Sequence, residues 1–124
     1  MTAVALPALP QLSPDECRLL QDLCDRIGGA VGDRVCAIKL FGSRARGDAR
    51  PDSDFDILVV VDKDDFELSE RIGRIAYDVY WDDDFRRYLS VKVMSRDQHA
   101  FLGSPPTGFY LSVEADAVTL WTQG

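Results

Sequence analysis

The stretch of sequence that decides the fold is Phe41-Gly42-Ser43-Arg44-Ala45-Arg46-Gly47-Asp48-Ala49-Arg50-Pro51-Asp52-Ser53-Asp54-Phe55-Asp56-Ile57-Leu58-Val59. Its first half is a glycine–serine turn followed by arginines. Its second half places two carboxylates, Asp54 and Asp56, at the start of an apolar run. Apolar segments on both sides predict two strands, over 35–41 and 55–61, joined by a short helical turn and a loop.

The size of the chain predicts a single globular domain. With 124 residues, of which 46% are hydrophobic, the chain is long enough to bury about two-thirds of its unfolded surface in a core. Residues 1–10 are apolar and rich in proline but lack a basic region. We therefore expect a flexible N-terminal arm over 1–10 rather than a signal peptide, and one domain over 11–124.

The net charge of −7 argues against extended nucleic-acid binding, which needs clustered positive charge. Lys39, Arg44, Arg46 and Arg50 make the central stretch locally positive, so a small anionic ligand is favoured over a long polyanion. No apolar run is long enough to span a membrane. Three cysteines without metal-ligand spacing predict a reduced, cytoplasmic protein.

Helical and strand periodicities continue on both sides of the central stretch. Ser13, Pro14 and Glu16 form a strong helix start, and Gly28-Gly29 weakens or ends that helix. The later predicted elements are a helix over 65–80, a strand over 88–94, a helix over 95–101, a helix over 107–115 and a strand over 117–121. We expect an α/β (α+β) fold in which helices pack on a small mixed β-sheet.

The glycine–serine turn is a candidate phosphate site. Gly42 lets the backbone approach a ligand closely, Ser43 adds a hydroxyl, and Arg44 and Arg46 bring positive charge. Such a turn alone is more often an ordinary capped turn than a binding site.

The two aspartates strengthen the case for a site. Residues two apart in a strand point to the same face, so the carboxylates of Asp54 and Asp56 lie side by side unless they are merely polar residues at a strand entrance. Paired carboxylates repel each other unless a cation neutralises them. Oxygen ligands of this kind suit Mg²⁺, which commonly binds to carboxylates and substrate phosphates together.

The sequences Gly42-Ser43-Arg44-Ala45-Arg46-Gly47 and Ser53-Asp54-Phe55-Asp56-Ile57 resemble the signature of the minimal nucleotidyltransferases (MNT) of the DNA polymerase beta superfamily. The resemblance implies that Gly42 and Ser43 hold the phosphates of ATP or another nucleoside triphosphate. It implies that Asp54 and Asp56 are catalytic and bind Mg²⁺, two ions in all, for transfer of a nucleoside monophosphate such as AMP to an acceptor hydroxyl. Arg44 or Arg46 would balance charge in the transition state.

The resemblance also implies a partner. Small proteins of this family commonly act with a separate helical partner of the HEPN class, and in such pairs the nucleotidyltransferase can serve as the antitoxin that adenylylates a tyrosine of the toxin.

One departure from the family pattern bears on activity. Active members carry a third carboxylate on the next strand, whereas the polar-facing positions of 88–94 are Ser90 and Lys92. Three readings follow: a nucleotidyltransferase, a nucleotide- or partner-binding module without turnover, and, less favoured, a phosphate-binding hydrolase.

Overall fold

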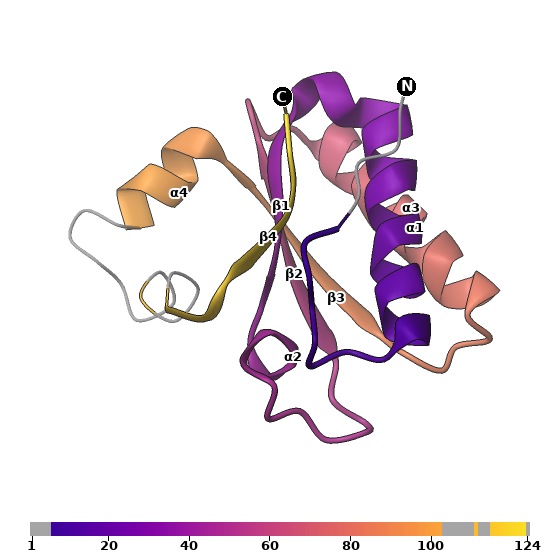
Figure 1. The fold of residues 1–124 in the computed structure, drawn as a ribbon. Coiled ribbons are helices and arrows are strands. Elements are labelled where there is room, and N and C mark those ends of the chain that lie inside the picture. Colours follow the sequence, from indigo (N-terminus) through magenta and orange to yellow (C-terminus); the bar gives the residue numbers. More distant parts are fainter. Residues whose placement is uncertain (1–5, 103–110, 112–114, 124) are drawn as a thin grey trace.

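The computed structural model describes residues 6–102, 111 and 115–123. Its elements are α1 (Pro14–Val31), η1 (Gly32–Arg34), β1 (Val35–Phe41), α2 (Ser43–Arg46), β2 (Phe55–Val61), α3 (Phe66–Asp82), β3 (Leu89–Ser95), α4 (Arg96–Leu102) and β4 (Val118–Thr122). The mixed α/β architecture expected from the sequence is confirmed (Figure 1).

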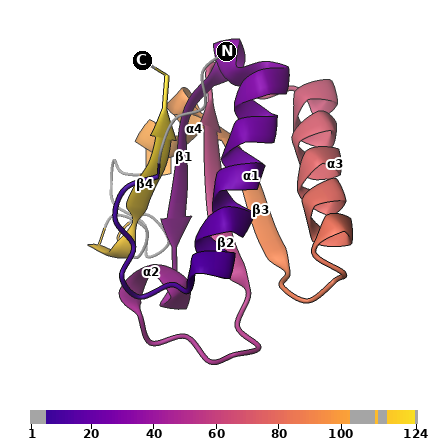
Figure 2. The ribbon, with the colours of Figure 1, turned by 45° about the vertical axis from the view of Figure 1, so that its right-hand side comes forward.

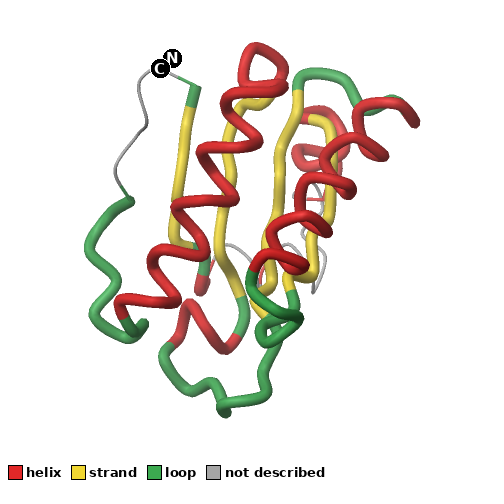
Figure 3. The backbone as a smooth tube through the Cα atoms, turned by 90° about the vertical axis from the view of Figure 1, so that its right-hand side faces the viewer, coloured by secondary structure: helices red, strands yellow, loops and turns green. Residues whose placement is uncertain are grey.

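The sheet has four strands in the order β3-β2-β1-β4. β1 pairs antiparallel with both β2 and β4, whereas β2 and β3 are parallel. Because parallel neighbours need a crossover connection, α3 carries the chain from the end of β2 back to the start of β3 (Figure 3). β1 and β2, the two strands beside the motif, occupy the centre of the sheet.

Helices α1 and α3 cover one face of the sheet, and α4 lies on the other side (Figure 2). The covered face holds the main core, to which α1, α3 and the alternate residues of β2 all contribute. Phe55 and Ile57 are fully buried there. The other residues of β2 alternate with these and point to the opposite face, where Leu58 and Val60 form a smaller cluster with Phe41 of β1. The side chain of Asp56 belongs to this second face because strand residues alternate.

Helix α1 begins as predicted and ends later than predicted. Ser13 and Glu16 form a reciprocal capping box, in which each side chain bonds the backbone of the other residue. The helix continues through Gly28 and Gly29 to Val31, so of the two alternatives, that the glycines weaken or end the helix, the second was wrong. Each glycine costs about 1 kcal/mol in a helix, but burial of Ile27 and Val31 offsets that cost.

The other predicted elements agree closely with the structure. β1 and β2 have the predicted bounds, and α3, β3 and β4 lie within two residues of theirs. Ser95 caps α4, since its hydroxyl accepts a hydrogen bond from the Gln98 amide. Most of the helix predicted over 107–115 lies outside the described residues.

Residues 6–10 of the expected N-terminal arm contact the domain. Leu9 is 7% exposed and joins the main core, and the Leu6 amide donates to the Gln21 side chain. No helix in the described part of the chain is long and apolar enough to cross a membrane.

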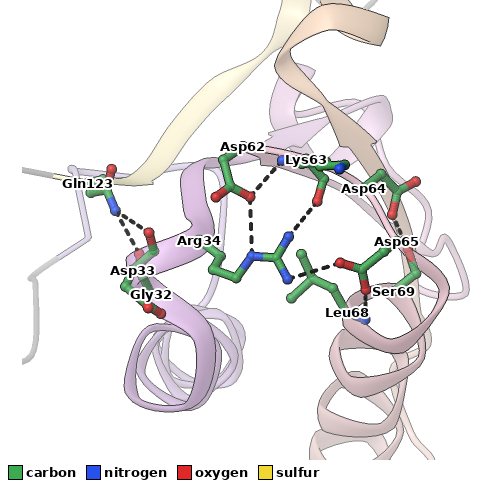
Figure 4. A network of polar contacts seen from close by, with 10 residues as sticks. All are labelled: Gly32, Asp33, Arg34, Asp62, Lys63, Asp64, Asp65, Leu68, Ser69 and Gln123. Atoms are coloured by element: carbon green, nitrogen blue, oxygen red, sulfur yellow. Dashed lines mark hydrogen bonds and ion pairs between the residues drawn. The ribbon is translucent and has the colours of Figure 1, made fainter.

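Arg34 forms a network of polar contacts at the end of the sheet that is remote from the Gly42–Asp56 motif (Figure 4). The Arg34 guanidinium donates to Asp62 at 3.3 Å, to Asp65 at 3.0 Å and to the Lys63 carbonyl at 2.8 Å. It thereby joins the start of β1 to the loop between β2 and α3.

Candidate functional site

The candidate site forms where α2 meets the start of β2. Gly42 follows β1, and Ser43 begins α2, a single turn of 4 residues. The strand register places Phe41 beside Asp56. The structure therefore brings the glycine–serine turn and the second carboxylate together across the central strand pair.

Gly42 is required at its position. Its backbone has φ +73° and ψ −159°, a conformation that is open essentially only to glycine. A Cβ atom built there would lie 2.4 Å from Oδ2 of Asp56, closer than any real contact. The Asp56 carboxylate therefore occupies the space that a side chain at residue 42 would need.

The two carboxylates differ in their surroundings. Asp56 is half-buried in β2, whereas Asp54 is exposed and lies just before the strand. Burial raises the pKa of the Asp56 carboxyl, the negative charge of Asp54 raises it further, and Lys92 and Arg46 oppose the rise. The Asp54 carboxylate makes no hydrogen bond or ion pair with any described residue. A cation beside both carboxylates would relieve their repulsion.

Arg44 lies next to this site but points into the protein. The residue is buried, and its guanidinium donates to Glu16 at 2.7 Å and to the carbonyls of Pro51 and Ser53. Its Cζ atom lies 4.5 Å from the centre of the Phe55 ring. The structure therefore does not turn Arg44 toward a ligand at Ser43.

Arg46 is turned toward the surface. Its guanidinium bonds Asp48 at 3.2 Å and Asp116 at 3.0 Å, and its charge reaches Asp56. Asp116 stands just before β4, 70 positions along the chain, and no local pattern in the sequence indicates it. The sequence around Glu16, the partner of Arg44, likewise indicates only a helix cap.

β3 carries the departure from the family pattern. The register pairs Ser90 with Asp56 and Lys92 with Leu58, so both side chains share the face of Asp56. Lys92 is exposed, and its positive charge offsets part of the rise in the pKa of Asp56.

The oxygen atoms of the site are suited to a single metal ion. Asp54 and Asp56 together suit one Mg²⁺ that completes its shell with water and phosphate oxygens. Among the described residues, no group of three or more histidine, cysteine, aspartate or glutamate side chains is arranged to hold a metal. The described residues thus fit one ion and supply no third carboxylate for a second.

A separate surface depression of about 340 Å³ lies between α1 and the end of α3. Its charges pair with one another: Asp83 is bonded to Arg86 and Arg87. Burial alone would raise the pKa of Asp83, but these two arginines outweigh burial and hold it below its ordinary value. We therefore assign this depression a structural role.

Comparison with protein-family models gives a match to residues 16–98, by a model described as a nucleotidyltransferase domain. The match spans well over half of the chain and includes both halves of the central motif. No curated protein matches the sequence at a significant level.

Solved structures with a similar fold include a candidate nucleotidyltransferase from Sulfolobus solfataricus, with a TM-score of 0.56 and 19% sequence identity over 86% of this chain and 79% of that chain. A toxin–antitoxin complex with AMP-PNP gives a TM-score of 0.47 and 21% identity, with coverage of 79% and 72%. A tri-AMPylated HEPN toxin of Shewanella oneidensis in complex with its MNT antitoxin gives 0.43 and 18%, with coverage of 84% and 72%. The last two scores are too low to establish a common fold.

Proposed function

Because this chain belongs to the nucleotidyltransferase domain family, we propose that it binds a nucleoside triphosphate, ATP in the first instance, and transfers its nucleoside monophosphate to an acceptor hydroxyl. The observation that carries the proposal is the contact between Gly42 and Asp56, where the turn leaves no room for a side chain. This contact joins a candidate phosphate-binding turn to a candidate metal-binding pair.

Each residue of the site has a proposed role. Gly42 lets the backbone approach the β- and γ-phosphates, and the Ser43 hydroxyl donates to one of their oxygens. Asp54 and Asp56 would hold Mg²⁺, and the chemistry that such an ion would supply there is Lewis acidity toward the phosphate and the acceptor oxygen. Arg46 faces the same surface, and we propose that it offsets negative charge on the phosphates.

The proposed transfer is a displacement at the α-phosphorus. The acceptor oxygen forms a bond to the α-phosphorus, the bond from that phosphorus to the α–β bridging oxygen breaks, and pyrophosphate leaves. The hydroxyl proton passes to solvent.

We propose a HEPN-type helical protein as the acceptor, adenylylated on a tyrosine, with this chain as its antitoxin. The support is the resemblance of the Gly42–Asp56 motif to that of the minimal nucleotidyltransferases. The two ions implied by that resemblance need ligands beyond the described carboxylates, so we propose one Mg²⁺ held by Asp54 and Asp56.

A second candidate function is nucleotide or partner binding without turnover. The observation in its favour is that Ser90 and Lys92 stand on β3 in register with Asp56 and Leu58, where active relatives carry a carboxylate. An ammonium group there cannot help to ionise an acceptor hydroxyl by binding metal.

The test is a transfer assay with ATP labelled on the α-phosphate, Mg²⁺ and the protein encoded beside this one. We expect label to appear on the partner, and to disappear with the double change Asp54→Asn and Asp56→Asn. The control Asp78→Asn alters an exposed aspartate on α3 and should leave transfer unchanged. Transfer that survives the double change would contradict the metal-carboxylate assignment, whereas nucleotide binding without any transfer would favour the second candidate.

A further inference from the structure

The Arg44 guanidinium lies at the centre of a network that joins three parts of the chain. It donates to Glu16 Oε2 at 2.7 Å, to the Pro51 carbonyl at 3.2 Å, and to the Ser53 carbonyl at 3.0 Å from Nη2 and 3.3 Å from Nε. The residue belongs to α2 and follows Ser43 directly. One side chain therefore connects the phosphate-binding turn, the start of α1 and the loop before β2.

These contacts fall on both sides of Asp54. The Ser53 carbonyl precedes Asp54, and the Phe55 ring, 4.5 Å from Arg44 Cζ, follows it. Phe55 is fully buried in the main core. Since the Asp54 carboxylate has no partner of its own among the described residues, its place depends on how the backbone around it is held.

Glu16 has two tasks, one for each carboxylate oxygen. Oε1 accepts from the Ser13 amide at 2.8 Å and so caps α1, while Oε2 accepts from Arg44. The exposed fractions of the Glu16 and Arg44 side chains are 16% and 9%, so the pair is largely shielded from water. Charged groups that are buried and paired in this way have a strong preference for one geometry.

An arginine held like this is poorly suited to bind phosphate. Every nitrogen of the Arg44 guanidinium already donates to an oxygen of the chain, and turning it toward a ligand would leave Oε2 of the largely shielded Glu16 carboxylate without its charged partner. Breaking a buried ion pair in that way is costly.

We infer that Arg44 is a positioning residue: oriented by Glu16, it holds the backbone of residues 51–53 and thereby sets the carboxylate of Asp54 near that of Asp56. The metal-binding part of this inference rests on the function proposed above. Residues that orient a metal ligand typically change metal affinity 10–100-fold when they are altered, without touching the metal.

Arg34 provides a matched control. Like Arg44, it bonds carboxylate and backbone carbonyl oxygens, in its case two carboxylates and one carbonyl, but at the far end of the sheet (Figure 4). Arg34→Gln therefore removes a similar set of bonds without disturbing the loop before Asp54.

The first measurement is Mn²⁺ affinity, followed by electron paramagnetic resonance at a temperature well below unfolding. We expect Arg44→Gln and Glu16→Gln each to weaken Mn²⁺ binding roughly tenfold, and the double variant to be little worse than either, because the two residues act as one unit. Arg34→Gln should bind Mn²⁺ like the unaltered protein.

Affinity for ATP in the absence of metal separates the two roles of Arg44. A positioning residue leaves that affinity nearly unchanged in both variants. If Arg44→Gln lost it while Glu16→Gln kept it, Arg44 would be a phosphate ligand and the inference would be overturned.

Hydrogen exchange of residues 48–54 tests the positioning without any metal. We expect at least tenfold faster exchange in Arg44→Gln and Glu16→Gln, and no change in Arg34→Gln. Unchanged exchange in the first two variants would overturn the inference. If the unaltered protein bound neither Mn²⁺ nor ATP, the proposed function would fail, whereas the exchange result would still decide the positioning role.

Discussion

Replacing Gly42 by alanine tests the contact on which the candidate site depends. The backbone at residue 42, with φ +73° and ψ −159°, costs a residue with a side chain about 1–3 kcal/mol. The new Cβ atom would also meet Asp56 Oδ2 at 2.4 Å, and forcing that carboxylate off its preferred rotamer costs about 1 kcal/mol more. We therefore expect Gly42→Ala to lower the free energy of unfolding by about 2–4 kcal/mol.

The assay is denaturant unfolding combined with Mn²⁺ titration. A loss of this size corresponds to a fall in Tm of roughly 10 °C for a domain of this length. Because the methyl group takes the place of a carboxylate oxygen, Mn²⁺ affinity should fall by about tenfold or more.

Gly73→Ala is the matched control. Gly73 lies within α3, and a Cβ atom there would meet nothing within 4 Å. The same chemical change should therefore raise stability by about 0.5–1 kcal/mol and leave Mn²⁺ binding unchanged. If Gly42→Ala were as stable as the unaltered protein and bound Mn²⁺ equally well, the close approach of residue 42 to Asp56 would be refuted.

Three further predictions concern charge. Burial and Asp54 raise the pKa of Asp56 in the folded state, so above the ordinary aspartate pKa the folded state holds more protons than the unfolded state, and the free energy of unfolding falls as pH rises. Asp56→Asn should therefore be more stable than the unaltered protein in urea at pH 7, and this gain should vanish below about pH 3.9. A variant that is less stable at pH 7 would contradict this. The pKa of Asp83 is lowered in the folded state, so the stability that this carboxylate contributes at neutral pH is lost on acidification. Arg87→Gln should lower the free energy of unfolding by about 2 kcal/mol at pH 7. If this loss did not shrink toward low pH, the ion pair between Asp83 and Arg87 would not be its cause. Lys92→Glu replaces a positive by a negative charge on the face of Asp56, so this variant should bind Mn²⁺ roughly tenfold more tightly than the unaltered protein. The Mn²⁺ affinity of Lys92→Ala should lie between the two, and equal affinities in all three proteins would place Lys92 outside the site.

Much of this protein is determined by short-range features of its sequence. The bounds of β1 and β2 follow from apolar runs, and the start of α1 follows from the Ser13–Glu16 capping box, because backbone preference and side-chain period act over a few residues. The sequence also indicates the proximity of Gly42 to Asp56, because two strands joined by a turn and a short loop tend to pair with each other.

Only the tertiary structure decided the roles of the two arginines. Their positions in the sequence are alike, yet Arg44 turns inward to Glu16 and Arg46 turns outward to Asp116. Burial and the partners available across the fold make that choice, and no local pattern encodes either.

The same reason explains why α1 passes through Gly28 and Gly29. Local propensity disfavours a helix there, but the sheet beneath supplies apolar surface on which Ile27 and Val31 are buried. Where a residue's preference depends on what packs against it, the sequence determines the candidates and the assembled fold selects among them, because the deciding contacts join residues far apart in the chain.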